Sequence, residues 1–529
     1  MNSKKSHHRH KQSINKYYGP LLIVLGLIYG LGFSKPLLWP LCIPYILLLG
    51  YMWVEKPEYR RLRLWTWLSG LALMMVVARW IADVNPSSWD LPGNFELGVF
   101  IIIVWLFSAL VWSLGFVALP HIYLLLRRLS SETMSRYGLF SVAFIVCEWL
   151  RSVLFSVANS GKGSSIGAFW SFGSFGLSFS KTPLIYTSRI VGLFGMSLLS
   201  LILVYGLFCF VRKVDRKLSG LLIAVVVIVT VLGLAWPQNN RPFEHTVTVV
   251  HKPYTVGITR VLEQSLPEDY KAPEVKSQLV VLSEYSRIFG EYESTQRSLF
   301  ASRLAGNSPS IFVDAGSYLT KDKHYNRIGL FEADGTMVDS QLKKLLIPEG
   351  EYIPYYTEWL IRLSGNGSVI PAFESARVDK FDQPTKTFSY GDERLGALAC
   401  SSVIAPDAYR EQTKNGATIL INSADLGVFH NSKSYYSQNI QLAKFEAVAN
   451  SRPYVQVAKQ GISTVIDHNG KIIDYLEDTE GLQVRSYDLT TNTTKTPYTV
   501  LGEWVLYASI AVTLASGGYF YGNRKVKKT

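Results

Sequence analysis

Charged residues are scarce in this chain of 529 residues: Asp, Glu, Lys and Arg make up 18%, whereas hydrophobic residues make up 48%. An average soluble chain carries roughly 25% charged residues, so this balance favours a membrane protein. The net charge is +13, but the excess lies in short patches beside apolar runs. There is no basic stripe with interleaved aromatics. The distribution is typical of a chain in a bilayer and argues against nucleic-acid binding.

Cysteine is also rare. Cys42, Cys147 and Cys209 lie inside apolar runs, where a small buried thiol needs no functional explanation. Cys400 is the only cysteine of the long segment 240–500. That segment therefore contains no internal disulfide, and its one thiol is free.

The N-terminal region lacks the small-residue cleavage site of a signal peptide. The basic start, Met1 to Lys16, leads directly into an apolar run, which we expect to be retained as a first helix. We interpret the histidines at positions 7, 8 and 10 as part of a basic cytoplasmic tail rather than as a metal-binding tract.

Repeats and low-complexity tracts are missing, and the first half of the chain is a series of apolar runs. Spanning a bilayer takes roughly 20 apolar residues. The candidate spans are Pro20–Phe33, Pro36–Val54, Leu64–Ile81, Val99–Leu126, Gly138–Val157, Val191–Val211, Leu221–Trp236 and, near the end, Trp504–Tyr521.

Positive charges between these runs predict their orientation, because basic loops stay in the cytoplasm. Lysines and arginines gather in the connections 56–63, 127–136 and 212–217 and in the two termini, whereas the connection 83–96 holds acids and neither Lys nor Arg. All basic loops fall on one side if about seven helices precede a large outside segment and one helix returns. We therefore expect both termini in the cytoplasm and residues 240–500 outside it.

The segment 240–500 alternates apolar runs of strand length with polar, helix-like stretches such as Ser434–Asn450. Asn469-Gly470 is a hairpin turn signal, and the mixture indicates a layered α/β domain. The expected strands are Thr246–Val250, Leu279–Leu282, Ser310–Val313, Ile328–Glu332, Leu395–Ala399, Thr418–Ile421, Tyr454–Ala458, Thr464–Asp467 and Leu482–Tyr487. We predict four parts: a basic tail 1–18, a transmembrane bundle 19–240, an extracytoplasmic domain 244–495 and a C-terminal transmembrane helix 502–522.

Three residues of this domain form a chemically sufficient set for acyl transfer through a thioester. Glu284 and Cys400 each end an apolar run, and Lys343 lies in Gln341–Glu351 with Lys344 as an adjacent rival. A thiol attacks as its thiolate, so it needs a base and a positive neighbour. A carboxylate supplies the base, and an ammonium stabilises the thiolate and then the oxyanion.

The order Glu284, Lys343, Cys400 resembles the Glu–Lys–Cys triad of the nitrilase superfamily, also called carbon-nitrogen hydrolases. The whole layout is similar to the apolipoprotein N-acyltransferase family, in which a transmembrane bundle precedes a nitrilase domain and one helix follows. The best local match is Lys343–Pro354, which selects Lys343 over Lys344 and gives Glu351 the place of a second, supporting glutamate. The resemblance implies an αββα sandwich domain and about eight transmembrane helices in a multi-domain membrane protein.

The membrane part carries the resemblance too. Glu148-Trp-Leu-Arg151 looks like the fifth helix of the family, and Gly192–Ser197 looks like the start of its sixth. Glu148 and Arg151 lie three residues apart on one helix face. They either form a structural ion pair or take part in binding a lipid headgroup.

The chain departs from the family pattern around the triad. Ser401 and Ser402 replace the usual aromatic and glutamate after the nucleophile, and Leu282-Ser283 replaces Trp-Pro before the first glutamate. The Gln-x-Asn motif is absent around His251–Tyr254, and a loop usually rich in Asn, Asp and Trp reads Asn422–Gly427. We expect Ser401 and Ser402 to act as supporting residues.

The resemblance implies a two-step reaction without metal or diffusible cofactor. Cys400 would take an acyl chain from a membrane phospholipid as a thioester, and the N-terminal amine of a diacylglyceryl-cysteine apolipoprotein would accept it. Glu284 would be the general base and acid, Lys343 would hold the oxyanion, and Glu351 would orient Lys343. The expected location is the bacterial inner membrane, with the catalytic domain periplasmic and the protein monomeric.

Aromatic residues follow directly after Lys343 and Glu351. Tyr352, Tyr356 and Trp359 are spaced by three and four residues in an amphipathic segment, which suits a substrate gate on the bilayer surface. The alternative is an ordinary helix packed on the domain core. Two other functions remain open: a membrane-tethered amidase, and a non-catalytic scaffold with a decayed nitrilase domain.

Overall fold

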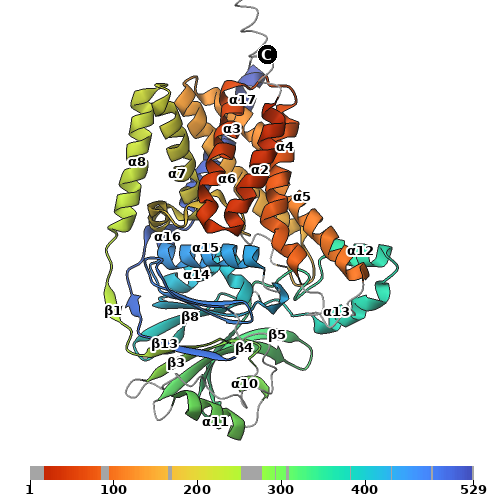
Figure 1. The fold of residues 1–529 in the computed structure, drawn as a ribbon, viewed down its shortest axis with the longest axis vertical. Helices are drawn as coiled ribbons and strands as arrows, with labels where there is room; N and C mark the ends of the chain where they lie inside the picture. The colour runs from red at the N-terminus through yellow and green to blue at the C-terminus, as the bar shows by residue number, and fades with distance from the viewer. Residues whose placement is uncertain are drawn as a thin grey trace, which may run out of the picture.

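A computed structural model describes residues 17–84, 95–164, 170–251, 277–286, 288–291, 294–305, 309–381, 383–429, 432–477 and 481–526. The expected basic tail, apart from residues 17 and 18, and the motif positions Lys252 to Tyr254 lie outside these ranges. The described chain forms a helical bundle joined end to end with a sheet-rich domain (Figure 1).

Apolar helices build the bundle. They are α2 (Tyr18–Ser34), α3 (Cys42–Glu55), α4 (Leu62–Val77), α5 (Phe95–Leu126), α6 (Thr133–Ala158), α7 (Ser188–Val211), α8 (Arg216–Leu234) and α17 (Trp504–Val526). Short 3₁₀ segments adjoin them: η1 (Pro36–Leu41), η2 (Ala78–Asp83), η4 (Arg127–Leu129), η5 (Phe175–Phe179) and η6 (Pro183–Thr187). In the described chain, 6 helical stretches are long and apolar enough to cross a membrane, and α2 and Trp504–Tyr519 are shorter apolar helices. The structure thus confirms the expected polytopic bundle.

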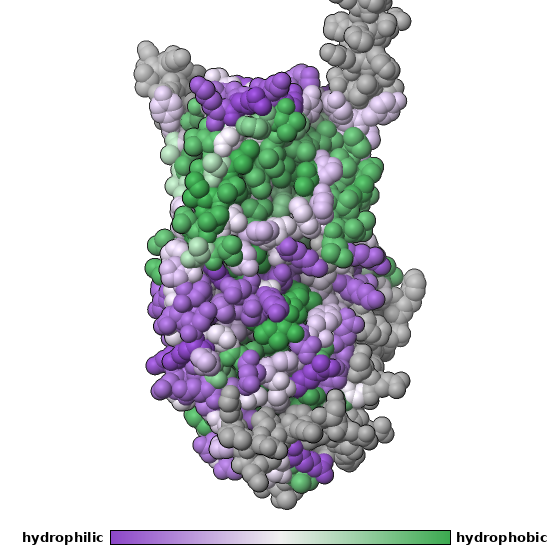
Figure 2. All heavy atoms as spheres, turned by 60° about the vertical axis from the view of Figure 1, so that its left-hand side comes forward, coloured by the Kyte–Doolittle hydropathy of each residue, from purple (hydrophilic) through white to green (hydrophobic). Residues whose placement is uncertain are grey.

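The outside of the bundle is apolar. Exposed aliphatic side chains line α8, among them Leu221, Ile228 and Leu232, which are 54–60% exposed. Figure 2 shows a broad hydrophobic band around the helices between hydrophilic regions above and below. A surface of this kind is unstable in water and fits the hydrocarbon of a bilayer.

The second part is a sandwich of two six-stranded sheets. The order of the first is β13 (Gln483–Tyr487), β2 (Thr246–His251), β3 (Gln278–Glu284), β4 (Ser310–Leu319), β5 (His324–Glu332) and β6 (Met337–Leu342). The order of the second is β12 (Ile472–Glu477), β11 (Ile462–Ile466), β10 (Tyr454–Lys459), β9 (Ile419–Asp425), β8 (Glu393–Ala399) and β7 (Phe388–Tyr390). A separate ribbon pairs β1 (Asn240–Pro242) with β14 (Thr490–Asn492).

Helices cover the outer face of each sheet. The short α10 (Ile288–Glu291) and α11 (Ser294–Ala305) pack on the first sheet, and α14 (Pro406–Lys414) and α15 (Lys433–Asn450) lie between the second sheet and the bundle (Figure 1). Buried aliphatic residues of both sheets, such as Val281 and Ile421, form the core between them. The expected αββα sandwich is therefore present, with parallel pairs β2–β3–β4 and β8–β9–β10 at its centre.

Hydrogen bonds of buried polar groups hold the sandwich and the bundle helices in place. Arg189, at the start of α7, is fully buried and donates hydrogen bonds to the carbonyls of Val448 (3.2 Å) and His468 (2.9 Å) in the sandwich. Glu503, just before α17, accepts hydrogen bonds of 2.8 and 3.1 Å from two backbone N–H groups of α7. Since a buried charge without partners is costly, the Arg189 contacts fix how the two parts sit together, and the Glu503 contacts hold the start of α17 against α7.

Candidate active site

Cys400 stands at a sharp turn between a strand and a helix. It follows the last residue of β8 and begins the 3₁₀ helix η8 (Cys400–Ile404), with a φ of 41°. Residues other than glycine seldom adopt positive φ, and such backbone strain gathers at functional sites. The thiol is buried, and its sulfur lies 3.7 Å from the carbonyl oxygen of Asp425.

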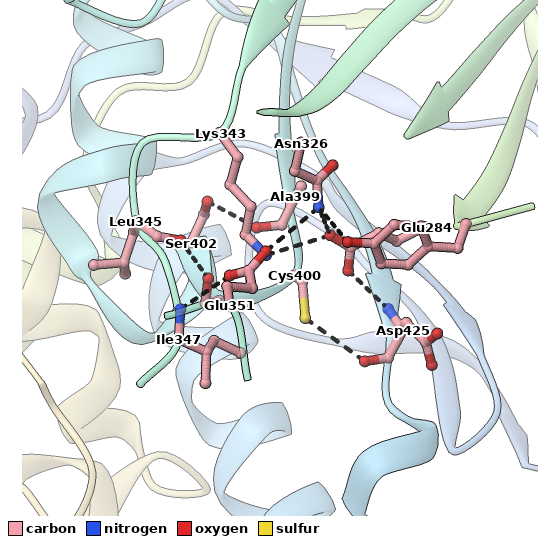
Figure 3. A network of polar contacts seen from close by, with 12 residues as sticks. Glu284, Asn326, Lys343, Leu345, Ile347, Glu351, Ala399, Cys400, Ser402 and Asp425 are labelled. Atoms are coloured by element: carbon pink, nitrogen blue, oxygen red, sulfur yellow. Dashed lines mark hydrogen bonds and ion pairs between the residues drawn. The ribbon is translucent and has the colours of Figure 1, made fainter. Parts of the chain in front are cut away.

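Glu284, Lys343 and Glu351 form a buried polar cluster beside that thiol (Figure 3). The Nζ atom of Lys343 lies 3.3 Å from Oε1 of Glu284 and 2.8 Å from Oε1 of Glu351. The second oxygen of Glu351 accepts the backbone N–H of Ile347 at 2.9 Å. One ammonium is thus held between two carboxylates, each of which is fixed by further contacts.

All three residues of the expected triad lie at strand ends. Glu284 is the last residue of β3, Lys343 follows β6 directly, and Cys400 follows β8. The rival Lys344 points elsewhere: its side chain is 45% exposed and its ammonium lies 3.8 Å from Glu411. The structure therefore places Lys343, and not Lys344, at the cluster.

Two further residues contact Glu284 and were not predicted. The side-chain amide of Asn326, in β5, donates a hydrogen bond to Oε1 of Glu284. The backbone N–H of Asp425 donates to Oε2 of Glu284 at 3.2 Å. Lys459 in turn binds the Asp425 carboxylate at 2.8 Å. These contacts aim the Glu284 carboxylate toward the centre of the site.

Burial dominates the protonation of the cluster. Burial raises the pKa of the Cys400 thiol well above its ordinary value, and the nearby Glu284 carboxylate raises it further. Burial also raises the pKa of Glu284, although Lys343 opposes that shift. For Lys343 burial alone lowers the pKa, but Glu284 and Glu351 outweigh it and the pKa rises. The resting site therefore holds a neutral thiol beside an ammonium, and deprotonation has to accompany attack.

Ser401 and Ser402 support the turn at Cys400 rather than the cluster itself. The hydroxyl of Ser401 donates to the carbonyl of Leu345 at 2.6 Å, and that of Ser402 donates to the carbonyl of Ala399 at 2.9 Å. The first contact ties η8 to the segment that carries Lys343. Both hydroxyls are buried, and each donates its hydrogen bond to a backbone carbonyl.

The aromatic segment is only partly as expected. The helix α12 (Tyr355–Leu363) begins after Pro354, and Trp359 is 60% exposed on it. Tyr356 is half-buried and stacks on Phe107 of α5 with ring centroids 4.0 Å apart. Tyr352 does not face outward: it is 4% exposed and donates to the carbonyl of Asn159 at 2.9 Å. Of the three expected gate residues, Trp359 alone presents a largely exposed ring.

Exposure of Trp359 leads to a test of the gate. We expect Trp359→Ser to lower acyl transfer from lipid vesicles several-fold, because an indole on this helix contributes apolar area to membrane contact. Labelling of Cys400 by a soluble thiol reagent should be unchanged. Ile473→Ser, at an exposed aliphatic residue of β12, is the matched control. Equal losses with vesicles and with the soluble reagent would contradict a gate.

Glu148 and Arg151 lie inside the bundle and not at its lipid-facing surface. Glu148 is 5% and Arg151 2% exposed. Glu148 accepts the backbone N–H of Phe175 at 2.6 Å, and Arg151 lies 3.8 Å from the sulfur of Met74. Both side chains are described, and no ion pair within 4.0 Å joins them. The expected direct pair is therefore not formed, although both side chains border the same small interhelical space.

Comparison with known families and proteins agrees with this architecture. The family description "Apolipoprotein N-acyltransferase N-terminal domain" matches residues 25–206, and "Carbon-nitrogen hydrolase" matches residues 266–496. The chain is 24% identical to an apolipoprotein N-acyltransferase of Geobacter metallireducens over 85% of both chains. It is 24% identical to one of Haemophilus influenzae over 94% of this chain and 93% of the other.

Solved structures give a weaker likeness. A carbon-nitrogen hydrolase of Helicobacter pylori is 19% identical, with a TM-score of 0.33, and the match covers 46% of this chain and 88% of that one. An amidase of Nesterenkonia is 16% identical with a TM-score of 0.33, and the match covers 51% of this chain and 97% of that one.

Proposed function

The chain belongs to the apolipoprotein N-acyltransferase family, and on that premise we propose that it moves an acyl chain from a membrane phospholipid, through a thioester on Cys400, to the N-terminal amine of diacylated apolipoproteins. The observation that carries the proposal is the buried cluster in which Lys343 lies 3.3 Å from Glu284 and 2.8 Å from Glu351, beside the Cys400 thiol. Membership makes the chain an acyltransferase of a bacterial membrane; the donor, the intermediate and the acceptor are the proposal.

The first step loads the enzyme. Glu284 takes the thiol proton as the Cys400 sulfur attacks the ester carbonyl carbon of the phospholipid. Lys343 stabilises the resulting oxyanion, together with a backbone N–H near Ser401. The carbon–oxygen bond to glycerol breaks, and Glu284 returns the proton to the departing alkoxide. A lysophospholipid leaves, and the acyl chain stays on sulfur.

The second step transfers the chain. The neutral α-amine attacks the thioester carbonyl, so that a carbon–nitrogen bond forms and the carbon–sulfur bond breaks. Glu284 passes a proton from nitrogen to the departing sulfur and regenerates the thiol. Glu351 does not touch the substrate in this scheme. It positions Lys343 through the 2.8 Å contact and is itself held by the N–H of Ile347.

Both substrates carry acyl chains, so the site has to open at the bilayer. Cys400 begins η8, and the Ile404 carbonyl of η8 accepts the backbone N–H of Ser171, in the loop after α6, at 3.3 Å. The helix α12 packs against α5 through Tyr356 and Phe107 (Figure 1). The connections α3–α4, α5–α6 and α7–α8, which carry the basic residues, lie at the end of the bundle away from the sandwich (Figure 1). Basic loops stay in the cytoplasm, which supports an inner-membrane protein with a periplasmic sandwich and cytoplasmic termini.

Transfer to a defined acceptor tests the proposal. Purified protein is incubated with phospholipid carrying a labelled acyl chain and a diacylated lipopeptide with a free N-terminus. The expected product is a triacylated peptide with the label as an amide on its N-terminus, as located by fragmentation mass spectrometry. A lipopeptide with an acetylated N-terminus should remain unlabelled. Release of free labelled fatty acid without any amide would instead indicate a hydrolase.

A further inference from the structure

A small apolar cavity lies between the bundle and the loops of the candidate site. Its volume is about 90 Å³, and its walls come from η2, α5, α6 and the segments 347–350 and 428–429. Aromatic side chains dominate, including Trp80, Trp112 and Phe429. The space is large enough to admit a small group such as an ammonium with its adjoining methylenes.

Glu349 is the one ionisable residue among the described residues that line this cavity. Its Oε1 atom accepts hydrogen bonds from the hydroxyls of Tyr356, at 2.5 Å, and Thr357, at 3.0 Å. No hydrogen bond from a described residue reaches its other carboxylate oxygen. A carboxylate bordered by apolar side chains is stabilised by a counter-charge, and this oxygen is available to accept from a bound cation.

The backbone at Glu349 is strained as well. Its φ is 59°, in the left-handed region that favours glycine, and its N–H donates to the carbonyl of Tyr352 at 2.9 Å. The chain places a large acidic side chain where glycine would be relaxed. Backbone strain of this kind gathers at functional sites.

The neighbouring charges leave Glu349 unpaired. Lys343 is engaged by Glu284 and Glu351, and no lysine or arginine is among the described residues that line the cavity. Burial raises the pKa of Glu349 to about 7, although the hydroxyls of Tyr356 and Thr357 oppose the shift. Near neutral pH the carboxyl is therefore poised to ionise when a cation arrives.

We propose that Glu349 binds the primary ammonium group of the lipid that accepts the acyl chain. The inference rests on the proposed function, because that function supplies an acceptor with a free N-terminal amine. The pKa of such an amine is about 8, so the acceptor arrives largely protonated. The ammonium pairs with the free carboxylate oxygen, and its first methylenes or peptide atoms contact the apolar wall. Ile404, the last residue of the 3₁₀ helix η8 that begins at Cys400, also lines this cavity, so η8 connects a cation bound there to the turn that carries the thiol.

The two half-reactions separate this role from the chemistry on Cys400. Acyl-enzyme is first prepared from labelled phosphatidylglycerol, whose headgroup has no amine, and then given a diacylated lipopeptide with a free N-terminus. We expect Glu349→Gln to form the adduct and to raise the KM for the lipopeptide about 10-fold or more, with a small change in kcat, because a charge-assisted hydrogen bond is lost. Glu358→Gln, on α12 but paired with Arg362 outside the cavity, is the matched control.

Hydroxylamine, a small nucleophile that needs no ammonium site, should release the label equally from both acyl-enzymes. Tyr356→Phe keeps the carboxyl but removes one of its donors, and should raise the KM by a smaller factor. If Glu349→Gln does not form the adduct, the lipopeptide KM of Tyr356→Phe becomes the test. An unchanged KM in Tyr356→Phe would then overturn the proposal. An unchanged KM in Glu349→Gln overturns it directly.

A donor arm identifies the source of the cation. Phosphatidylethanolamine also carries a primary ammonium, so adduct formation is compared between this donor and phosphatidylglycerol. If Glu349→Gln slows loading from phosphatidylethanolamine alone and leaves lipopeptide transfer intact, the cation belongs to the donor and our assignment is wrong. Failure of the unaltered protein to form any adduct would count against the proposed function and not against the binding site.

Discussion

Cys400→Ala should abolish acyl transfer to the lipopeptide while leaving the protein folded. No other group at the cluster replaces a thiol as nucleophile, because Lys343 is tied to two carboxylates as an ammonium and Glu284 serves as base. Removing one small buried side chain leaves the hydrogen bonds of Glu284 with Asn326 and Asp425 in place. We expect activity to fall below detection, measured as labelled amide formed on the peptide.

Other cysteines provide the matched controls for this variant. Cys209 is buried in α7, far along the chain from the cluster, and Cys209→Ala removes a thiol of the same size. It should retain transfer, since a small buried thiol in a bundle only fills space. Retained transfer in Cys400→Ala, at a rate within a few-fold of the unaltered protein, would show that the reaction does not pass through this sulfur.

Glu284→Gln should reduce transfer by about 100-fold to 10,000-fold, the usual contribution of a positioned general acid or base. Glutamine keeps the shape of the side chain and can still accept from Asn326, but it takes no proton from the thiol. Burial already holds the Cys400 thiol in its protonated form. Without the carboxylate, only the small fraction of molecules whose Cys400 thiol is already ionised can attack the ester.

The measurement for this variant is single-turnover loading of Cys400 from labelled phospholipid. Glu411→Gln is the control, because Glu411 is a partly exposed carboxylate 3.8 Å from Lys344, outside the cluster. Loading in Glu284→Gln at a rate near that of Glu411→Gln would assign the base to another group.

The sequence was informative wherever one physical signal dominated. Apolar runs marked each helix of the bundle, and the strand expected at Leu395–Ala399 is β8, which ends beside Cys400. The turn signal at Asn469-Gly470 also holds: Gly470 has a φ of 82° between the antiparallel β11 and β12. These features follow from local chemistry, and local chemistry is readable along the chain.

Strands made of polar residues cannot be predicted from apolar runs. The strand β6 lies at the edge of its sheet, and its residues Met337–Leu342 are mostly exposed or half-buried, so no apolar run marked it. The sequence pattern therefore does not reveal Lys343 as a third strand-end residue. The apolar pattern also places the start of the next strand at Ile328, whereas β5 begins at His324, so it does not reveal Asn326 as a strand residue.

Tyr352 shows the limit of a spacing argument. Counted by threes and fours it joins the face of α12, but the helix begins only after Pro354, and Tyr352 belongs to the preceding turn. The Tyr352 side chain packs against the loop after α6. Gly163 in this loop allows the close approach, because a Cβ on Gly163 would lie only 2.9 Å from Cβ of Tyr352. Contacts between segments so distant in the chain carry no periodic signal.

Detection of a covalent acyl adduct on Cys400 tests the account most directly. Purified protein is incubated with labelled phospholipid and no acceptor, digested, and analysed by mass spectrometry for the peptide that contains residue 400. We predict one acyl group on that peptide, removed by neutral hydroxylamine as a thioester is. Well-folded protein that hands the label to a lipopeptide, yet never carries it on this cysteine, would contradict the account.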